Sequence, residues 1–407
     1  MKKLVTLVSL MICMWSCDSQ KENTQDKFTC VDVEKQIRYC EKQLRKSVEN
    51  LDPQQKKLPR NIEHGEATWS CSHWSGWTAG FYPGILWYMY EATNDNYWKE
   101  KATEWTLVLD SNKCRDWKDH DLGFVMYCSY GNAYRLTKDT SWLSPIYMAA
   151  DTLMTLFNPQ VGTILSWPWM KRKKGWPHNT IIDNMMNLEM LMFVAQMKND
   201  ERYRQVAIQH ANMTKQHHFR DDFTTYHVIV YDSARPVPLQ KVTFQGYADN
   251  SMWARGQAWA IYGFTMMYRF TKQKEYLVQA QKAADVYLER LPEDYIPYWD
   301  FMAPNIPHEE RDASAAAITA SALIELADHS EEPLRQKYFQ SSQKMLATLS
   351  SEEYLADDKN HAFLLHSVGF KPAGGEIDMP IIYADYYYLE ALLRTKQFKE
   401  KYPNSCM

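Results

Sequence analysis

Several features that would identify other classes of protein are missing from this chain. Its 46 Lys and Arg residues face 50 Asp and Glu residues in a chain of 407, which gives a net charge of −4. The chain therefore lacks the basic excess with which proteins attract nucleic acid or an anionic membrane surface, and an anionic ligand must be bound by local groups. After the N-terminal segment, no stretch approaches the roughly 20 apolar residues of a transmembrane helix.

Cysteine is scarce and irregularly spaced. Two of the eight cysteines, Cys13 and Cys17, belong to the N-terminal segment. The other six show neither the paired spacing of a zinc site nor the density of a disulfide-stabilised small domain. We therefore expect buried thiols, with a Cys30–Cys40 bridge as the alternative, and neither a metal nor an organic cofactor. The six are Cys30, Cys40, Cys71, Cys114, Cys128 and Cys406.

Two common catalytic motifs are also absent. Gly374-Gly375 lies in an irregular segment and lacks the preceding strand and the spacing of a phosphate-binding loop. Ser314 has no base at an obvious spacing, so a serine hydrolase is not indicated.

The N-terminal segment has the features of an export signal. Lys2 and Lys3 precede an apolar stretch, residues 4–14, that is too short to span a bilayer. Ser16 then precedes Cys17, which resembles a bacterial lipoprotein cleavage box. We expect a signal peptide over residues 1–16, lipidation of Cys17 with an ordinary cleaved signal as the alternative, a polar tether over residues 17–30 and one domain over residues 31–407. The protein would lie in the periplasm or be anchored to a membrane of a Gram-negative bacterium, touching the membrane only through Cys17.

Aromatic residues are abundant. The chain has 15 Trp and 26 Tyr, and aromatics make up 14% of it. Flat rings with a polar edge stack on sugars and nucleobases, and the missing basic field argues against nucleic acid.

Four apolar, helix-like runs end in similar polar stops, at Thr93, Thr137, Lys198 and Thr271. Counting back about 15 residues, or four turns at 1.5 Å per residue, from each stop reaches Trp77, Asp121, Asp183 and Arg255. Equal offsets place these four residues at the same end of their helices. If the helices pack side by side, an aromatic ring, two carboxylates and a guanidinium converge on one rim, a combination that suits a charged sugar.

The remaining pattern is helical almost throughout. Residues 32–48 predict a first amphipathic helix, and residues 264–270, 313–326 and 383–393 continue the series. Helices poor in charge would be inner, and charged ones such as residues 272–290 would be outer. The only strand-like stretches, residues 226–231 and 241–244, predict a small hairpin. About twelve alternating helices favour an all-α (α/α)6 barrel.

An open solenoid of tetratricopeptide type is the alternative fold. It would need a period near 34 residues, whereas the four stops lie 44, 61 and 73 residues apart. A closed toroid with loops of varying length fits this spacing better.

Three motifs contain the residues that could do chemistry. His120-Asp121-Leu-Gly-Phe and Ile182-Asp183-Asn-Met-Met-Asn each begin an inner helix. One such Asp could simply cap its helix, but two at equal offset favour a carboxylate pair with distinct pKa values. Trp253-Ala-Arg255-Gly-Gln-Ala-Trp259 begins a third helix, where arginine could bind a carboxylate and tryptophan could stack on a ring. Gly256 would leave the backbone accessible beside Arg255.

Together these motifs, with Gln245-Gly-Tyr and Asp385-Tyr-Tyr-Tyr-Leu-Glu-Ala-Leu-Leu, resemble the unsaturated glucuronyl hydrolases, glycoside hydrolase family 88. The resemblance covers residues 69–394. It implies a six-fold α/α barrel with a deep pocket for the 4,5-unsaturated uronic acid that polysaccharide lyases leave at a non-reducing end. It also implies that Asp183 is the general acid and base and Asp121 its catalytic partner. The expected sugar contacts are Trp77, His120, Trp167 or Trp169, His227, Thr243, Gln245, Trp253, Arg255 and Trp259. Phe244 departs from the family pattern, where relatives often carry His.

The chemistry that the resemblance implies is hydration of an enol ether. Asp183 would protonate C4 and then accept a proton from the water that attacks C5. Asp121 would hold the sugar hydroxyls and raise the pKa of Asp183 by like-charge proximity. The irregular segment 366–379 would border the leaving sugar, where Lys371 could contact a sulfate; a solvated loop charge is the alternative.

Two other functions are compatible with the sequence. An unsaturated rhamnogalacturonyl hydrolase, acting on pectin fragments, would share the barrel and the same Asp residues, whereas glycosaminoglycan-type fragments suit the glucuronyl type. A non-catalytic glycan-binding lipoprotein would bind such sugars without consuming their double bond.

Overall fold

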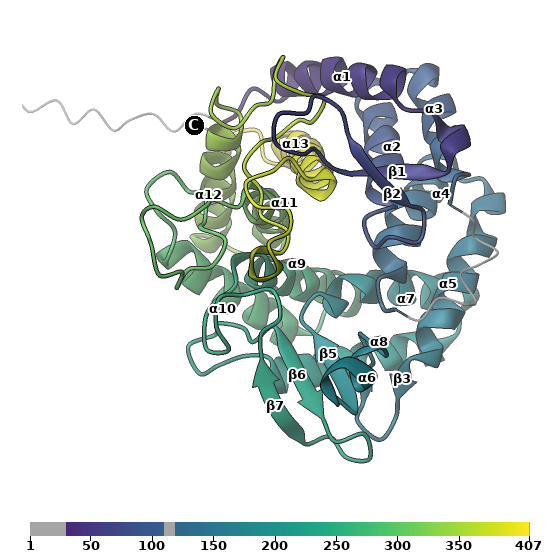
Figure 1. The fold of residues 1–407 in the computed structure, drawn as a ribbon, viewed down its shortest axis with the longest axis vertical. Coiled ribbons are helices and arrows are strands. Elements are labelled where there is room, and N and C mark those ends of the chain that lie inside the picture. The colour runs from purple at the N-terminus through teal and green to yellow at the C-terminus, as the bar shows by residue number, and fades with distance from the viewer. Residues whose placement is uncertain (1–29, 110–118, 407) are drawn as a thin grey trace, which may run out of the picture.

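The computed structural model describes residues 30–109 and 119–406. The expected signal peptide, the lipidation site at Cys17 and nearly all of the tether lie outside these residues, as does Cys114. The described chain forms a closed ring of helices, with six inner helical elements surrounded by six outer helices (Figure 1). The expected (α/α)6 barrel is confirmed.

The inner ring closes because each inner element packs against the next and the last packs against the first. In order these are α2 (Phe81–Thr93), the π-helix η3 (Gly123–Gly131) continued by α4 (Asn132–Thr137), α7 (Asn184–Lys198), α9 (Ala254–Thr271), α11 (Ala313–His329) and α13 (Ile382–Lys401). Each carries one outer partner, in the same order α3 (Asn96–Thr106), α5 (Leu143–Thr155), α8 (Glu201–His217), α10 (Lys274–Glu289), α12 (Leu334–Leu349) and α1 (Val33–Asn50).

Burial explains which helices are inner. Fourteen of the 17 residues of α11 are buried, as expected for a helix that is apolar around its whole circumference. The outer helix α10 alternates buried Ala and Tyr positions with exposed Lys and Glu. Among the described residues, no helix is both long and apolar enough to cross a bilayer.

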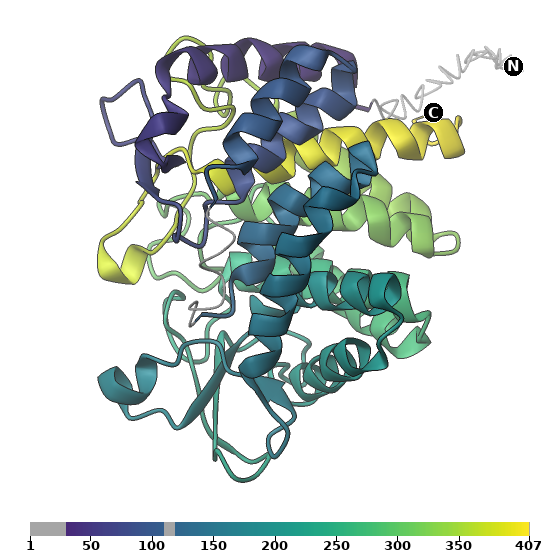
Figure 2. The ribbon, with the colours of Figure 1, turned by 90° about the vertical axis from the view of Figure 1, so that its right-hand side faces the viewer.

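The four polar stops are helix ends, as predicted. The helices end at Thr93, Thr137, Lys198 and Thr271, and each following residue adopts the left-handed conformation that terminates a helix. Three of the four are then followed by an Asp whose side chain caps the next helix. All four turns therefore lie at one end of the barrel, while the longer loops gather at the other (Figure 2).

The strands are more numerous than the sequence indicated. The expected hairpin is present as β6 (Val228–Tyr231) and β7 (Pro238–Val242), but β5 (His178–Ile181) joins β6 to make a three-stranded antiparallel sheet. Two further antiparallel pairs, β1 (Lys57–Asn61) with β2 (Ser70–His73) and β3 (Phe157–Asn158) with β4 (Thr163–Ile164), were not predicted. The three-stranded sheet sits beside the inner-helix starts and supports the site described below.

The cysteine prediction was wrong in one respect. Cys30 forms a disulfide with Cys406, 376 residues away, and not with Cys40. The two ends of the domain meet because α1 packs against α13 and closes the ring. Cys40 is a buried thiol as expected, while Cys71 and Cys128 are only partly buried.

Candidate active site

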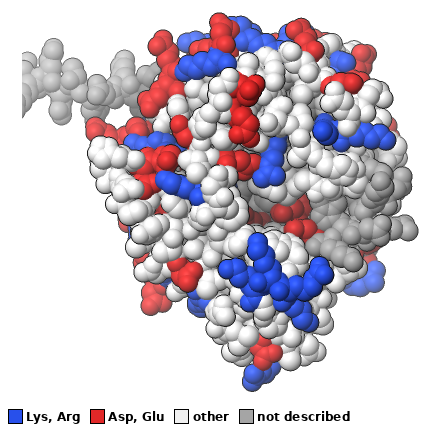
Figure 3. All heavy atoms as spheres, in the orientation of Figure 1, with Lys and Arg blue, Asp and Glu red and all other residues white. Residues whose placement is uncertain are grey.

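A cavity of about 270 Å³ lies at the end of the barrel where the inner helices begin. The four residues that equal spacing brings together, Trp77, Asp121, Asp183 and Arg255, all line it, as do the expected contacts Trp167 and Gln245. The other lining residues are Ser75, Asp119, Trp169, Ile181, Phe244 and Phe370. In the space-filling view, acidic atoms appear in a hollow near the centre of this face (Figure 3).

Neither acidic residue is merely a helix cap. Asp183 occupies the N-cap position of α7, yet its backbone is already helical and its side chain makes no capping hydrogen bond. The Asp121 carbonyl accepts the first hydrogen bond of η3, from Val125 at 3.1 Å, and the Asp121 carboxyl group lines the cavity. Both side chains are therefore presented to a ligand.

Asp183 faces a neutral histidine. The backbone N–H groups of Phe244 and Gln245 both donate to Nδ1 of His227, each at 3.1 Å. A nitrogen that accepts two such bonds carries no proton, so the proton of the neutral ring is on Nε2. Nε2 lies 3.7 Å from Oδ2 of Asp183. Burial lowers the pKa of His227 well below its usual value, which keeps the ring uncharged.

Asp121 has a matching partner. Oδ1 of Asn187 accepts the backbone N–H of Phe124 at 3.1 Å, so the amide nitrogen of Asn187 faces Nδ1 of His120 at 3.3 Å. Nε2 of His120 therefore carries the proton, and it lies 3.5 Å from Oδ1 of Asp121. Burial lowers the pKa of His120 to about 3. His120 and His227 thus do not line the cavity, but each places an N–H close to one of the two carboxyl groups that do.

Burial controls the charge of Asp183. Removal from water raises its pKa to about 7, against the lowering effects of the Arg255 guanidinium and the Trp259 indole. The expectation that Asp121 holds this pKa up by like charge was wrong. The effect runs the other way: burial, then the charges of Asp119 and Asp183, raise the pKa of Asp121 well above its usual value.

Asp119 is a third carboxyl group that the sequence reasoning missed. Burial raises its pKa to about 7, and it lines the cavity beside Asp121. Asp119, His120 and Asp121 bring possible ligand atoms within 4.8 Å of one another, the one group among the described residues that could hold a metal ion. Because Nε2 of His120 is a proton donor, this arrangement suits proton chemistry better than metal ligation.

Arg255 is fixed rather than free. It is 1% exposed, and its guanidinium binds Oδ2 of Asp312 at 3.2 Å and the carbonyl of Gly369 at 2.6 Å. It therefore holds the segment 366–379 against the barrel while placing a positive charge at the cavity. Gly256 does not leave the backbone open: a Cβ there would lie 2.6 Å from the Trp253 ring, so the glycine permits close packing.

Aromatic rings form one wall of the cavity. The Trp167 ring lies 5.9 Å from Trp169 and 5.3 Å from Phe244, and Phe370 packs on Phe244 at 4.9 Å. Such a wall can stack against the apolar face of a sugar ring. Phe244, which was expected to depart from the family pattern, is thus part of the wall.

Three of the expected contacts lie behind the cavity lining. The Thr243 hydroxyl accepts the Gly246 N–H at 2.9 Å and shapes the loop before α9. The Trp253 ring packs on His227, 4.6 Å between centroids, and Trp259 is fully buried next to Phe124. These side chains position the lining residues and do not line the cavity themselves.

Lys371 is not available for a sulfate. Its Nζ binds Oε2 of Glu309 at 2.6 Å and is paired with Glu310 as well. It packs over the Trp299 ring and is not part of the cavity lining. The predicted sulfate contact is therefore not supported.

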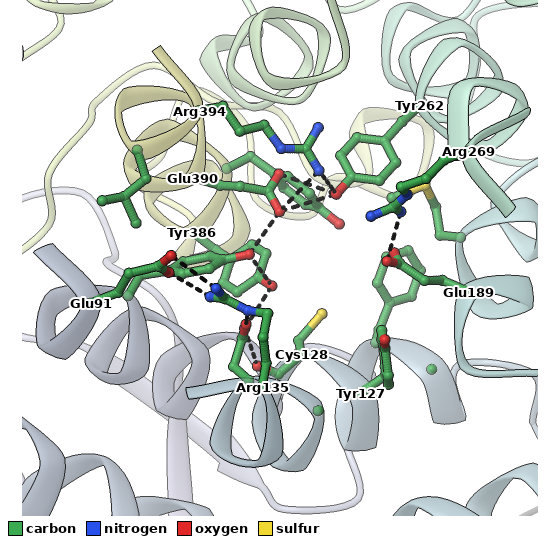
Figure 4. A pocket seen from close by; sticks show the side chains of 18 of the residues that line it. Glu91, Tyr127, Cys128, Arg135, Glu189, Tyr262, Arg269, Tyr386, Glu390 and Arg394 are labelled. Atoms are coloured by element: carbon green, nitrogen blue, oxygen red, sulfur yellow. Dashed lines mark hydrogen bonds and ion pairs between the residues drawn. The ribbon is translucent and has the colours of Figure 1, made fainter. Parts of the chain in front are cut away.

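A second hollow, also about 270 Å³, lies at the opposite end of the barrel (Figure 4). Its three arginines are each paired with a glutamate: Arg135 with Glu91 at 2.5 Å, Arg269 with Glu189 at 2.7 Å, and Arg394 with Glu390 at 3.6 Å. Since the charges compensate one another, this network closes the end of the barrel and offers no unpaired arginine to a ligand.

Comparison with known proteins gives a consistent picture. The profile of Glycosyl Hydrolase Family 88 matches residues 47–401. The chain is 41% identical to an unsaturated glucuronyl hydrolase of Formosa agariphila, over 97% of this chain and 98% of that protein. It is 36% identical to an unsaturated chondroitin disaccharide hydrolase of Streptococcus pyogenes, over 78% and 80% of the two chains. A crystal structure of an unsaturated glucuronyl hydrolase specific for heparin superimposes with a TM-score of 0.86 at 42% identity, covering 90% of this chain and 98% of that one.

Proposed function

The chain belongs to Glycosyl Hydrolase Family 88 and is a glycosidase of the unsaturated glucuronyl hydrolase type, and from this we propose how its own residues act. The substrate is an oligosaccharide of glycosaminoglycan type, cut by a lyase, that carries a 4,5-unsaturated uronic acid at its non-reducing end. Asp183 is the acid and base, and the uronic acid ring occupies the cavity between Asp121, Arg255 and the aromatic wall.

The first step is proton transfer to carbon. Asp183, with a pKa of about 7, is about half protonated at neutral pH and can donate to C4 of the enol ether. The electron pair of the double bond forms the new C–H bond, and positive charge develops at C5 and the ring oxygen. The carboxylate left on Asp183 stabilises that charge, and the Nε2 of His227 lies 3.7 Å from its Oδ2.

The second step adds water. The Asp183 carboxylate accepts a proton from a water molecule as its oxygen bonds to C5, which restores the acid and forms a hemiketal. Opening of the hemiketal then releases the leaving sugar. Because the glycosidic bond breaks after hydration, the usual relation between carboxylate spacing and stereochemistry does not apply.

Asp121 and Arg255 bind and orient the ring. Burial and its acidic neighbours raise the pKa of Asp121 well above its usual value. This favours the neutral carboxyl group, which can both donate to and accept from sugar hydroxyls. Arg255 attracts that carboxylate, although its own hydrogen bonds to Asp312 and Gly369 restrict it to an electrostatic role or to the donors it has left.

One observation carries this proposal: two carboxyl groups from separate inner helices face a single cavity, and one has a pKa near neutrality. The test is Asp183→Asn. We expect loss of turnover by at least about 10³-fold, because the acid is removed while the ring still fits, with substrate binding retained by calorimetry. Consumption of the double bond, followed by ultraviolet absorbance, measures turnover. A near wild-type rate would contradict the role of Asp183.

The same assay distinguishes the substrate classes. The similarity to a heparin-specific structure and to a chondroitin disaccharide hydrolase supports glycosaminoglycan-derived disaccharides. Faster turnover of pectin-derived unsaturated disaccharides would instead indicate a rhamnogalacturonyl hydrolase. Binding of either class with no loss of absorbance would leave only a glycan-binding protein.

We further propose that the protein is exported and anchored through Cys17. The Cys30–Cys406 disulfide supports an oxidising compartment, and the segment 1–16 resembles a lipoprotein signal. Mass spectrometry of the protein from its native membrane fraction tests this: a diacylglyceryl modification on Cys17 is expected, and an unmodified mature N-terminus would show an ordinary cleaved signal.

A further inference from the structure

The rim of the cavity carries a short, strongly basic helix. α6 (Met170–Lys174) contributes Lys171, Arg172, Lys173 and Lys174, four consecutive basic residues that are all exposed. In the space-filling view, a cluster of basic side chains borders the acidic hollow at the place where α6 lies (Figures 1 and 3). In a chain with a net charge of −4, this is a local concentration of positive charge beside the mouth.

The helix is firmly attached at both ends. Met170, at its start, is fully buried, and Trp176, just after it, is 6% exposed; both pack in one cluster with Trp167 and strands β5 and β6. Gly175 ends the helix with φ +70°, a conformation that glycine adopts without strain. The four charges are therefore held in place rather than carried on a free loop.

Lys173 connects the basic helix to the cavity. Its Nζ lies 5.3 Å from the centroid of the Trp169 ring and 5.7 Å from that of Phe244, and both rings line the cavity. Trp169 is itself 37% exposed. Both distances are within the range at which a cation and an aromatic ring attract each other. The aromatic surface therefore extends from the cavity wall to solvent, with the Lys173 ammonium group over it.

The ion pairing of α6 differs from that of other cations nearby. Among the described residues, none of the four forms an ion pair with a carboxylate. Lys371, in the segment 366–379, is paired with Glu309 and Glu310, and Arg60 of β1 is paired with Glu376 of that segment. These four basic groups, which have no acidic partner within residues 30–109 and 119–406, can bind an anion at the mouth.

The size of the cavity determines which part of a bound oligosaccharide lies over α6. At about 270 Å³ the cavity is smaller than the roughly 300–1,000 Å³ of pockets for drug-sized ligands, so it holds about one sugar ring and leaves the next sugar at the mouth. The uronic acid ring occupies this space in the proposed function, beside Asp121 and Asp183. An anionic substituent on the leaving sugar is best accommodated outside, over α6.

We propose that α6 and Trp169 form a subsite for a sulfated leaving sugar, with Lys173 nearest the cavity and its neighbours providing the surrounding positive charge. The assignment rests on the proposed function, because it concerns the leaving group of that reaction. Trp169 supplies a face for the sugar ring, and the basic side chains select sulfated over unsulfated substrates without taking part in proton transfer.

The test replaces all four charges in one variant, Lys171→Gln, Arg172→Gln, Lys173→Gln and Lys174→Gln. We expect KM for unsaturated disaccharides with a sulfated leaving sugar to rise about tenfold at low ionic strength, since several exposed ion pairs are lost, while kcat is unchanged. KM for the unsulfated disaccharide should stay the same. The preference of the wild-type enzyme for sulfated substrate should fade at roughly 1 M salt, where the screening length is about 3 Å.

A matched control removes the same charge elsewhere. Lys272→Gln, Lys274→Gln, Lys396→Gln and Lys399→Gln act near the C-terminal ends of α9 and α13 and the start of α10, away from the mouth. This control should leave both KM values unchanged, and the single variant Lys173→Gln should show part of the effect. Equal melting temperatures confirm that the variants fold.

Three outcomes would overturn the subsite: an unchanged KM for sulfated substrate in the α6 variant, an equal rise for sulfated and unsulfated substrates, or an equal effect of the control. Binding of anionic lipid vesicles that depends on α6, with unchanged KM, would assign the helix to a membrane instead. Failure of the proposed function is distinct, because the wild-type enzyme would then consume no unsaturated disaccharide at all.

Discussion

Asp183 is a carboxyl group that its surroundings keep partly protonated at neutral pH. Its burial disfavours the charged form, and neither the nearby Arg255 guanidinium nor the Trp259 indole outweighs that effect. His227 faces it with an N–H while remaining neutral itself. A buried carboxyl group that is a weak acid is what protonation of carbon requires at physiological pH.

The pH dependence of the reaction follows from this pKa. Asp183 must begin each cycle protonated, and its protonated fraction falls as pH rises through about 7. We therefore expect kcat/KM to be highest below about pH 7 and to fall about tenfold per pH unit above it. A pH series of initial rates, in one buffer system at constant ionic strength, measures this. An activity that increases between pH 7 and 9 would show that the deprotonated form starts the reaction.

At the scale of residues, repetition made the main acid predictable. Asp121 and Asp183 stand out because each lies about 15 residues before a helix end. Inner helices of similar length bring residues at this offset to the same end of the barrel. Asp119 and Phe370 lie in irregular segments, where no period marks them. The tautomer of His227 depends on two backbone N–H groups, which no side-chain pattern reveals.

At the scale of elements, the contact between η3 and α7 sets the position of Asp121. A Cβ on Gly123 would lie 2.6 Å from Oδ1 of Asn187, the atom that accepts the Phe124 N–H and so directs the Asn187 amide towards His120. The glycine of the His-Asp-Leu-Gly-Phe motif is therefore required for a side-chain network, not for a turn.

Gly123→Ala should disturb this network. We expect the protein to lose about 1–3 kcal/mol of its free energy of unfolding, because a methyl group is forced into a close contact, and kcat to fall by about tenfold or more as His120 and Asp121 shift. Denaturant unfolding and initial rates measure the two effects. Gly65→Ala is the comparison: Gly65 has a φ of +82°, and a Cβ added there would meet no neighbouring atom. It should therefore lower stability through backbone strain alone and leave the activity unchanged. Full activity of Gly123→Ala would show that Asn187 does not position these residues.

Elements were predicted to the extent that they are long and periodic. The helix ends were identified because the stops are left-handed positions that Asn and Lys occupy before a capping Asp. The predicted β6 is a short run of β-branched and aromatic residues, whereas the equally short strands β1 to β5 lack such a run. Their pairing depends on which loops the barrel brings together, and five residues or fewer show no reliable alternation.

At the scale of the molecule, closure of the ring was predictable and its consequence for the termini was not. The count of alternating helices indicated a toroid, but the Cys30–Cys406 pairing follows only from the contact of α1 with α13. Cysteines 376 residues apart give no signal in their spacing.

Removal of this disulfide should lower stability without changing catalysis. In the double variant Cys30→Ser and Cys406→Ser, we expect the free energy of unfolding to fall by about 2–4 kcal/mol, since the unfolded chain loses a long closed loop, with kcat within about twofold of wild type because the bond lies away from the cavity. Denaturant unfolding measures the difference, and reduction of the wild-type protein should reproduce it. Identical stability of the oxidised and reduced proteins would contradict this expectation.

The disulfide also bears on how the proposed anchor at Cys17 would orient the barrel. It joins the start of the described chain to the segment just after α13, and Figure 2 shows that this end of the molecule is turned away from the side with the long loops and α6. If the protein is anchored through Cys17 as proposed, the attachment to the bilayer would be on the side of the barrel away from the cavity. The mouth of the cavity would then face away from the bilayer, so that oligosaccharides could reach it without obstruction by the lipid surface.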